Sequence, residues 1–169
     1  MTKLKEYLPQ FNKQNILVLG DMIADEFISG QPERISREAP VLILEQQNQE
    51  ILPGGGTNAA NNVSALGGQV YVAGVIGDDR VGRELTQQLK AEGIKTEGLI
   101  VDHSRPTAVK TRILAGGEET VKQQVVRVDK LETHPISNEV EAKLLTYIKE
   151  VIDEIDAILL SDYGNGVFT

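Results

Sequence analysis

Three consecutive glycines at residues 54–56, followed by Thr57 and Asn58, combine residue types that bind oxygen-rich ligands. Glycine permits turns that other residues do not adopt and leaves room for a ligand against the main chain. Apolar residues then recur at helical spacing: Ala59, Ala60, Val63 and Leu66. They predict a helix over residues 57–66, whose start offers free N–H donors and a partial positive charge. The alternative is a glycine turn that only packs a helix against a sheet.

Carboxylates follow two predicted strands. Residues 15–20 are a continuous apolar run that stops at glycine, and Asp21 and Asp25 come after it. Asp162 follows a second run, residues 157–160. Ligands of open α/β sheets bind beyond the carboxyl ends of the strands, where carboxylates can accept hydrogen bonds from the hydroxyls of a sugar. The alternative for each is a turn-forming or solvated aspartate.

Three basic residues are predicted to share one surface. Lys110 and Arg112 alternate with Val109 and Thr111, so both point to one face of a strand, and Arg127 lies on its hairpin partner. Three cations facing a cleft would suit a phosphorylated substrate, because arginine binds phosphate in a bidentate way. The alternative is a solvated strand face.

The elements that position these residues alternate along the chain. Buried strands are predicted at residues 15–20, 71–76 and 157–160, and helices at 57–66, 81–89 and 140–155. This order predicts βαβ units with right-handed crossovers. We therefore expect an α/β fold: a doubly wound, mostly parallel sheet with helices on both faces.

Two stretches interrupt that order. Residues 25–52 alternate polar and apolar side chains, contain two prolines and show no helical pattern. Residues 106–129 hold two strand-like runs, 107–114 and 120–128, joined by Ala-Gly-Gly-Glu, a plausible hairpin turn. Both predict a small extra β-sheet over one end of the domain, serving as a lid, a dimer surface or both.

Composition limits the class of protein. The chain has 169 residues, of which 40% are hydrophobic and 25% charged, as in ordinary soluble domains. Its net charge of −8 argues against nucleic acid as a partner. The chain has no cysteine, no signal-peptide pattern at its start and no apolar run near the roughly 20 residues of a membrane span. We expect a soluble, cytoplasmic protein.

Several common chemistries lack their sequence patterns. There is no Gly-x-x-x-x-Gly-Lys-Ser/Thr phosphate loop, and no Gly-x-Gly-x-x-Gly follows the first strand. His103 and His134 lie in predicted loops, and two histidines without cysteine leave little for zinc. Asp78 and Asp79 are expected to cap the next helix rather than to bind metal.

Together these residues resemble the PfkB family of ribokinase-like sugar kinases. Residues 54–60, with Gly67 and Gly77, are similar to that family's first signature in residue type and spacing. The similarity runs from the Gly-Asp-x-x-x-Asp at residues 20–25 to the final Ser-Asp-Tyr. Within the family, residues 34–41 and 161–163 most resemble the D-glycero-beta-D-manno-heptose-7-phosphate kinase branch (RfaE domain I) of lipopolysaccharide-core precursor synthesis.

The resemblance implies roles for the residues singled out above. The sugar hydroxyls would be held by Asp25, with Asp21 nearby, and by Gly54, Gly55 and Asn58. The existing phosphate of the substrate would be bound by Lys110, Arg112 and Arg127. Segments 25–52 and 106–129 would form a lid that excludes water and pairs with the lid of a second subunit. This reading requires Asp25 and Asn58 to share one pocket.

Two departures from the family pattern limit that transfer. Asn165 stands where related heptose kinases usually carry a lysine. The second signature, a Gly-Ala-Gly-Asp that brings the catalytic base and an anion hole, is absent. Residues 1–169 are therefore expected to be the N-terminal part of a single kinase domain, with no catalytic or metal-binding residue of its own. ATP and Mg²⁺ would be bound mainly by the missing half, so the chain alone would transfer nothing.

The expected function is ATP-dependent phosphorylation of a sugar or sugar phosphate hydroxyl, with heptose 7-phosphate as the favoured substrate. One alternative is a kinase for an unphosphorylated sugar or a nucleoside. Another is a non-catalytic half-kinase that serves as a binding or dimerisation module. A homodimer through the β lid is expected, and neither nucleic acid nor a membrane is expected as a partner.

Overall fold

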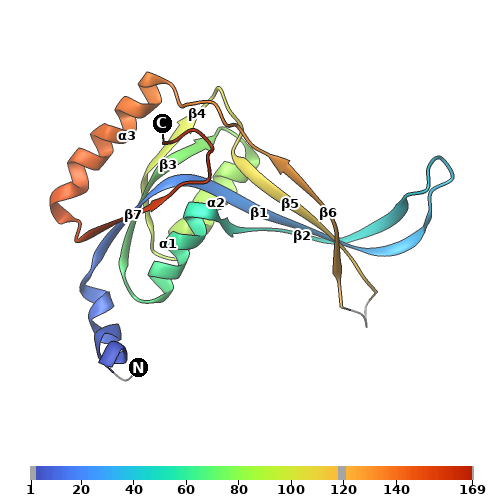
Figure 1. The fold of residues 1–169 in the computed structure, drawn as a ribbon, viewed down its shortest axis with the longest axis horizontal. Coiled ribbons are helices and arrows are strands. Elements are labelled where there is room, and N and C mark those ends of the chain that lie inside the picture. The colour runs from blue at the N-terminus through green and yellow to red at the C-terminus, as the bar shows by residue number, and fades with distance from the viewer. Residues whose placement is uncertain (1–2, 118–120, 169) are drawn as a thin grey trace.

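The computed structural model describes residues 3–117 and 121–168, in which strands and helices alternate along the chain (Figure 1). The helices are η1 (Lys3–Lys13), α1 (Gly55–Ala65), α2 (Arg80–Ala91), α3 (Asn138–Val151) and η2 (Ile152–Glu154). The strands are β1 (Asn15–Ile35), β2 (Leu42–Gly54), β3 (Gln69–Gly77), β4 (Lys95–Asp102), β5 (Ala108–Ala115), β6 (Gln123–Lys130) and β7 (Ala157–Ser161).

A parallel sheet with helices on both faces forms the centre of the fold, as predicted. Its strand order is β4-β3-β1-β7, and every neighbouring pair is parallel. On one face Val18 and Val72 pack with Leu85 of α2, and on the other Leu17 packs with Leu144 of α3. Alternate side chains of these strands enter two separate cores, which is why the strands read as continuous apolar runs. The α/β fold class is confirmed.

The first strand does not end at Gly20, as the sequence predicted, but runs for 21 residues to Ile35. Up to Asp21 it pairs with β3 and β7, and from Ile23 onward it pairs with β2 and β5. The backbone stays extended because new neighbours take over its hydrogen bonds where the first sheet ends. A Cβ at Gly20 would lie 2.1 Å from the carbonyl oxygen of Ser161, so glycine here serves close packing against β7.

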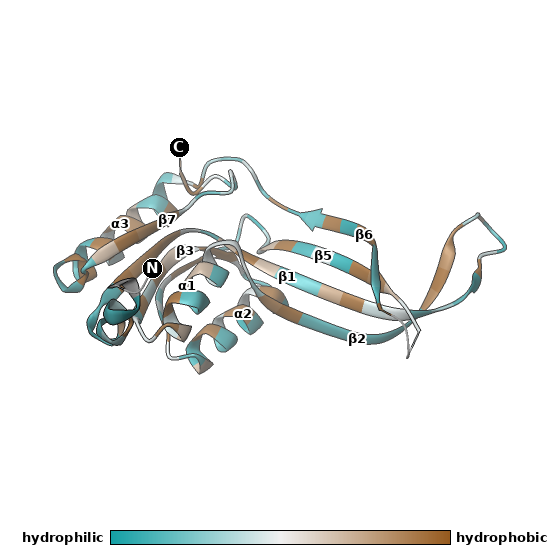
Figure 2. Ribbon diagram, turned by 60° about the horizontal axis from the view of Figure 1, so that its bottom comes forward, coloured by the Kyte–Doolittle hydropathy of each residue, from teal (hydrophilic) through white to brown (hydrophobic). Residues whose placement is uncertain are grey.

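A second sheet continues from the far half of β1 in the order β2-β1-β5-β6. It matches the predicted extra sheet, although its pairing begins at Ile23 and its last strand ends at Lys130. Thr120 and Glu118 of the predicted hairpin lie outside the described residues. The β1–β2 hairpin extends beyond β5 and β6 (Figure 1), and β5 shows alternating hydrophilic and hydrophobic bands (Figure 2). This banding is typical of a sheet with one face exposed.

Strand β4 is not among the predicted strands. It lies at the edge of the parallel sheet, so Glu97 and Val101 are exposed while Gly98 and Leu99 are buried. Edge position explains why its sequence mixes charged and apolar residues instead of forming an apolar run. None of the helices in the described part of the chain is long and apolar enough to cross a membrane.

Candidate functional site

The glycine turn joins β2 to α1 and packs directly on β1. Gly55 has φ +49°, and a Cβ at Gly56 would lie 2.9 Å from the carbonyl oxygen of Asp21. The hydroxyl of the fully buried Thr57 lies 2.8 Å from the carbonyl oxygen of Ile23 and 2.6 Å from that of Gly54. Close packing of a helix start against a strand therefore accounts for Gly55 and Gly56. The anchoring of the turn to β1 by the Thr57 hydroxyl was not predicted from the sequence.

Asp25 and Arg112 form an ion pair beside this turn. The Arg112 Nη1 donates to Asp25 Oδ1 over 2.7 Å, and the two side chains remain 23% and 25% exposed, respectively. A Cβ at Gly54 would lie 2.8 Å from the Asp25 Cγ, so glycine lets the carboxylate lie against the turn. The structure thus brings a carboxylate, a guanidinium and the start of α1 to one place, still open to solvent.

The other predicted cations lie on the same face of the second sheet. In register, Lys110 is opposite Asp25, and Arg127 is opposite Arg112. Arg127 pairs with Asp129 at 2.8 Å, a charge-assisted contact that the sequence analysis did not predict. The shared face agrees with the predicted alternation, while a role in binding phosphate stays a prediction.

Two aromatic side chains that sequence reasoning missed accompany these cations. The Arg112 guanidinium lies 5.3 Å from the centroid of the Phe27 ring, and the Lys110 ammonium lies 5.0 Å from that of Tyr163. These distances allow cation–π attraction. The period-two spacing from Asp25 places Phe27 on this face and could have revealed it, whereas Tyr163 comes from the segment after β7 and carried no such signal.

Asp21 is buried and binds the backbone of the segment that follows β7, residues 163–165. Only 1% of Asp21 is exposed, and its Oδ2 accepts hydrogen bonds from the backbone N–H groups of Tyr163 at 2.7 Å and Asn165 at 3.2 Å. Within the described residues, Asp21 Oδ1 and Asn165 Nδ2 have no partner. Both line a cavity of about 20 Å³, enough for one water molecule. A sugar could reach the Asp21 carboxylate only if residues 163–165 moved away from it.

The remaining predicted site residues, Asn58 and Asp162, are exposed. Asn58 lies in the first turn of α1, and within the described chain no hydrogen bond joins it to Asp25. Asp162 Oδ1 accepts a hydrogen bond from the backbone N–H of Gly164 at 2.8 Å, the turn-forming role that the sequence analysis kept as its alternative. Whether either side chain binds a sugar stays a prediction.

Glu26 forms a buried junction on the opposite face of β1. It accepts hydrogen bonds from Gln49 at 2.6 Å, from Thr111 at 2.8 Å and from Arg80 of α2 at 3.2 Å. Burial raises the pKa of this carboxyl, but these three hydrogen bonds and the Arg80 charge outweigh burial and hold the pKa below its ordinary 4.5. Glu26 therefore ties β1, β2, β5 and α2 together behind the Asp25 face.

The start of α2 is capped as predicted. Asp79 Oδ1 accepts hydrogen bonds from the Gly82 N–H at 2.9 Å and the Thr107 hydroxyl at 2.7 Å, and its Oδ2 accepts one from the Thr107 N–H at 3.0 Å. Burial raises the pKa of Asp79, but these bonds outweigh it and lower the pKa below 3.8. This carboxylate therefore also anchors the segment that leads into β5.

Comparison with known proteins places the chain in a family. The family model described as pfkB family carbohydrate kinase matches residues 13–153. A Helicobacter pylori protein named Bifunctional protein HldE is 44% identical over 154 residues, which cover 91% of this chain and 32% of that protein. The Wolinella succinogenes protein of the same name is 42% identical, over 93% of this chain and 32% of its own length. The chain spans about a third of the length of these curated relatives.

Solved structures show the same fold. A carbohydrate kinase from Agrobacterium tumefaciens has a TM-score of 0.62 at 23% identity, covering 87% of this chain and 45% of that one. Arabidopsis thaliana ribokinase, complexed with ribose and ATP, has a TM-score of 0.57 at 16% identity, covering 87% and 44%. The glycine turn, the two joined sheets and the family match over most of the chain agree, and the chain belongs to the pfkB family of carbohydrate kinases.

Proposed function

We propose that residues 1–169 are the N-terminal part of an ATP-dependent kinase that phosphorylates a hydroxyl of a sugar phosphate, with heptose 7-phosphate as the favoured substrate. The membership of the pfkB family and the relatives named HldE support a sugar kinase of this branch. The observation that carries the proposal is the Asp25–Arg112 pair beside the glycine turn.

The chemistry of that pair suits a phosphorylated polyol. A carboxylate accepts hydrogen bonds from sugar hydroxyls, and a guanidinium has five N–H donors, of which the ion pair with Asp25 uses one at Nη1. Lys110 and Arg127 add positive charge on the same face. The start of α1 has no side-chain cap, so no side chain competes with a ligand for its first N–H groups.

The rest of the enzyme would supply the donor and the catalytic base. We infer that ATP and Mg²⁺ are bound mainly by the part of the protein beyond this chain, since the relatives are about three times as long. The described residues contain no group of three or more histidine or carboxylate side chains that could hold a metal ion. An ATP-dependent reaction fits the cytoplasm, which we propose as its compartment.

We also propose a homodimer formed through the second sheet, with segments 25–52 and 106–129 acting as a lid over the substrate. Two exposed valines, Val126 and Val128, share one face of β6, and Val121 and Val125 near them are exposed as well. Exposed apolar side chains gathered on one strand are typical of a protein–protein contact. Sedimentation of the protein before and after Val126→Lys tests this proposal, and an unchanged mass would contradict it.

Binding measurements on the longer protein test the substrate proposal. Heptose 7-phosphate and the plain heptose should be titrated into the original protein and into Asp25→Asn and Arg112→Ala variants. A hydrogen bond to a charged group is worth about 1.5–3 kcal/mol, so we expect Arg112→Ala to weaken the phosphorylated sugar about tenfold or more beyond its effect on the plain sugar. Asp25→Asn should weaken both sugars.

The matched control is Arg83→Ala, which removes an exposed arginine of α2 that pairs with Asp78, outside the second sheet. It should leave both affinities unchanged. Equal losses for the two sugars in Arg112→Ala would show that this side chain does not select phosphate, and the favoured substrate would then be an unphosphorylated sugar or nucleoside. Binding without any phosphoryl transfer by the longer protein would favour the non-catalytic module.

A further inference from the structure

A groove of about 730 Å³ runs between α3 and the edge of the parallel sheet. Its walls come from β3, β4 and α3: Tyr71, Lys95, Glu97, Glu139, Tyr147 and Glu150 are among its lining residues. Lys95 is the first residue of β4, so this end of the groove lies at the amino ends of the parallel strands. Asp25 lies beyond their carboxyl ends, and the groove is therefore separate from the proposed sugar site.

Tyr147 forms the floor of the groove. The residue is only 9% exposed, and a Cβ at Gly98 would lie 2.2 Å from its Cε1, so the ring lies directly on the backbone of β4. Within residues 3–117 and 121–168 its hydroxyl makes no hydrogen bond. Burial raises the pKa of Tyr147 to about 12, assisted by the negative charges of nearby groups that include Glu97 and Glu150. The Tyr147 ring is therefore buried, while its hydroxyl opens into the groove, where carboxylates surround it.

One ammonium group of the chain itself, that of Lys95, lies against the wall of the groove. The Lys95 Nζ lies 3.9 Å from the centroid of the Tyr71 ring and donates a hydrogen bond to the Tyr71 hydroxyl. That hydroxyl donates in turn to Glu154 over 2.8 Å. An aromatic ring with a carboxylate beside it is a favourable environment for an alkylammonium ion. Lys95 shows that this wall of the groove provides one.

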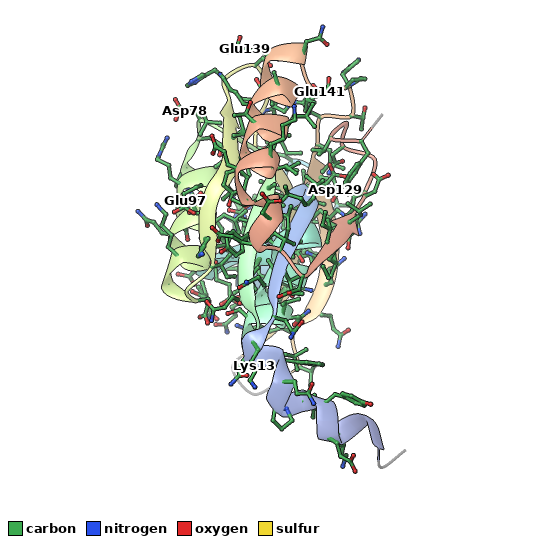
Figure 3. The ribbon with its side chains drawn as sticks, turned by 90° about the vertical axis from the view of Figure 1, so that its left-hand side faces the viewer. Lys13, Asp78, Glu97, Asp129, Glu139 and Glu141 are labelled. Atoms are coloured by element: carbon green, nitrogen blue, oxygen red, sulfur yellow. The ribbon has the colours of Figure 1, made fainter. Side chains whose placement is uncertain are left out.

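Two carboxylates of the groove make no direct ion pair, although one of them, Glu97, is attracted by the nearby Lys95 ammonium. Glu139 pairs with Lys143 at 2.6 Å, and Glu154 is engaged through Tyr71. Glu97 and Glu150 make no ion pair or hydrogen bond in the described part of the chain. Figure 3 looks onto α3, with Glu97 of β4 beside the helix. Carboxylates without a direct ion pair therefore lie on both walls of the groove, Glu97 on β4 and Glu150 on α3.

We propose that this groove binds an alkyl polyammonium ion of the polyamine class. Its ammonium groups would pair with Glu97 and Glu150, and one of them would donate a hydrogen bond to the Tyr147 hydroxyl oxygen. Its methylene chain would lie along the floor of the groove. A single metal ion fits less well, because no group of three or more carboxylate or histidine side chains converges within the described residues. An anion would meet the unpaired carboxylates and be repelled.

Isothermal titration of the 169-residue chain with spermidine tests the proposal. A protein of net charge −8 attracts any polycation, so hexaamminecobalt(III), a compact trivalent cation without a methylene chain, is titrated at the same ionic strength. We expect spermidine to bind more tightly. We expect the double substitution Glu97→Gln and Glu150→Gln to weaken spermidine about tenfold, and Tyr147→Phe to weaken it by a smaller factor.

The matched control is the double substitution Glu141→Gln and Asp153→Asn, which removes the same two charges from exposed positions outside the groove lining. It should change the affinity less than about twofold. All of these substitutions except Tyr147→Phe alter exposed side chains, and circular dichroism checks that each variant is folded. Equal effects of the control pair and of the Glu97→Gln, Glu150→Gln pair would mean diffuse attraction and overturn the proposal. Equal affinity for the two trications would overturn it as well.

Discussion

The Thr57 hydroxyl holds the glycine turn to β1, and Thr57→Val tests that role. Valine keeps the shape of threonine but removes the hydroxyl, which lies within 2.8 Å of the Ile23 carbonyl oxygen and 2.6 Å of the Gly54 carbonyl oxygen. Thr57 is fully buried, so water cannot replace the lost donor. Leaving buried acceptors without this donor costs about 2 kcal/mol. In a domain of this size such a loss lowers Tm by about 6 °C.

The assay is thermal and urea unfolding of the chain, followed by circular dichroism. The matched control is Thr146→Val, in which an exposed hydroxyl of α3 loses a 2.8 Å hydrogen bond to the Ala142 carbonyl oxygen. Because water can solvate that carbonyl, the control should change the free energy of unfolding by less than about 0.5 kcal/mol. Equal effects of the two substitutions would refute the reasoning, since burial is the only physical difference invoked between them.

Two further predictions concern carboxylates. Asp79→Ala removes the α2 cap to Gly82 and both hydrogen bonds from Thr107, and should lower the free energy of unfolding by about 2–3 kcal/mol. The neighbouring Asp78→Ala breaks only exposed ion pairs and should lower it by less than about 1 kcal/mol. Urea unfolding that ranks the two variants the other way would contradict the role of Asp79 as a cap. The pKa of native Glu26 lies below its ordinary 4.5, so the native state binds this proton less tightly than the unfolded state does. The ionised carboxylate therefore stabilises the native state fully at pH values above the ordinary pKa, and this stabilisation is lost as the pH falls toward the native pKa. Glu26→Gln should therefore make stability, measured by urea unfolding from about pH 6 to about pH 3, fall less steeply than in the original protein; an equal slope would show that Glu26 contributes none of the pH dependence.

Much of the fold follows from local patterns. The apolar run at residues 15–20 predicts the start of β1, though not its continuation to Ile35, and the helical spacing after residue 56 predicts α1. Burial on both faces of a strand or on one face of a helix leaves a direct periodic mark in the sequence. Asp79 is recognisable as a cap because an aspartate before a helix satisfies backbone donors within a few residues. Strand β4 left no such mark, since an edge strand tolerates charged residues on its exposed side.

The site depended on contacts between distant parts of the chain. Nothing in the local sequence of Asp21 shows that its carboxylate binds the backbone of residues 163–165, more than 140 positions away. Similarly, Arg112 meets Asp25 only because β1 continues past Gly20 and takes β5 as a parallel neighbour.

By itself, the sequence determined the α/β class, the glycine turn with its helix and the shared face of Lys110, Arg112 and Arg127, because each depends on residue type and short spacing. Only the tertiary structure decided which charges meet, which carboxylate is closed off from solvent and how far β1 extends. The physical reason is that strand pairing and ion pairing join residues far apart in the chain, and their partners are chosen by register and packing rather than by neighbours in sequence.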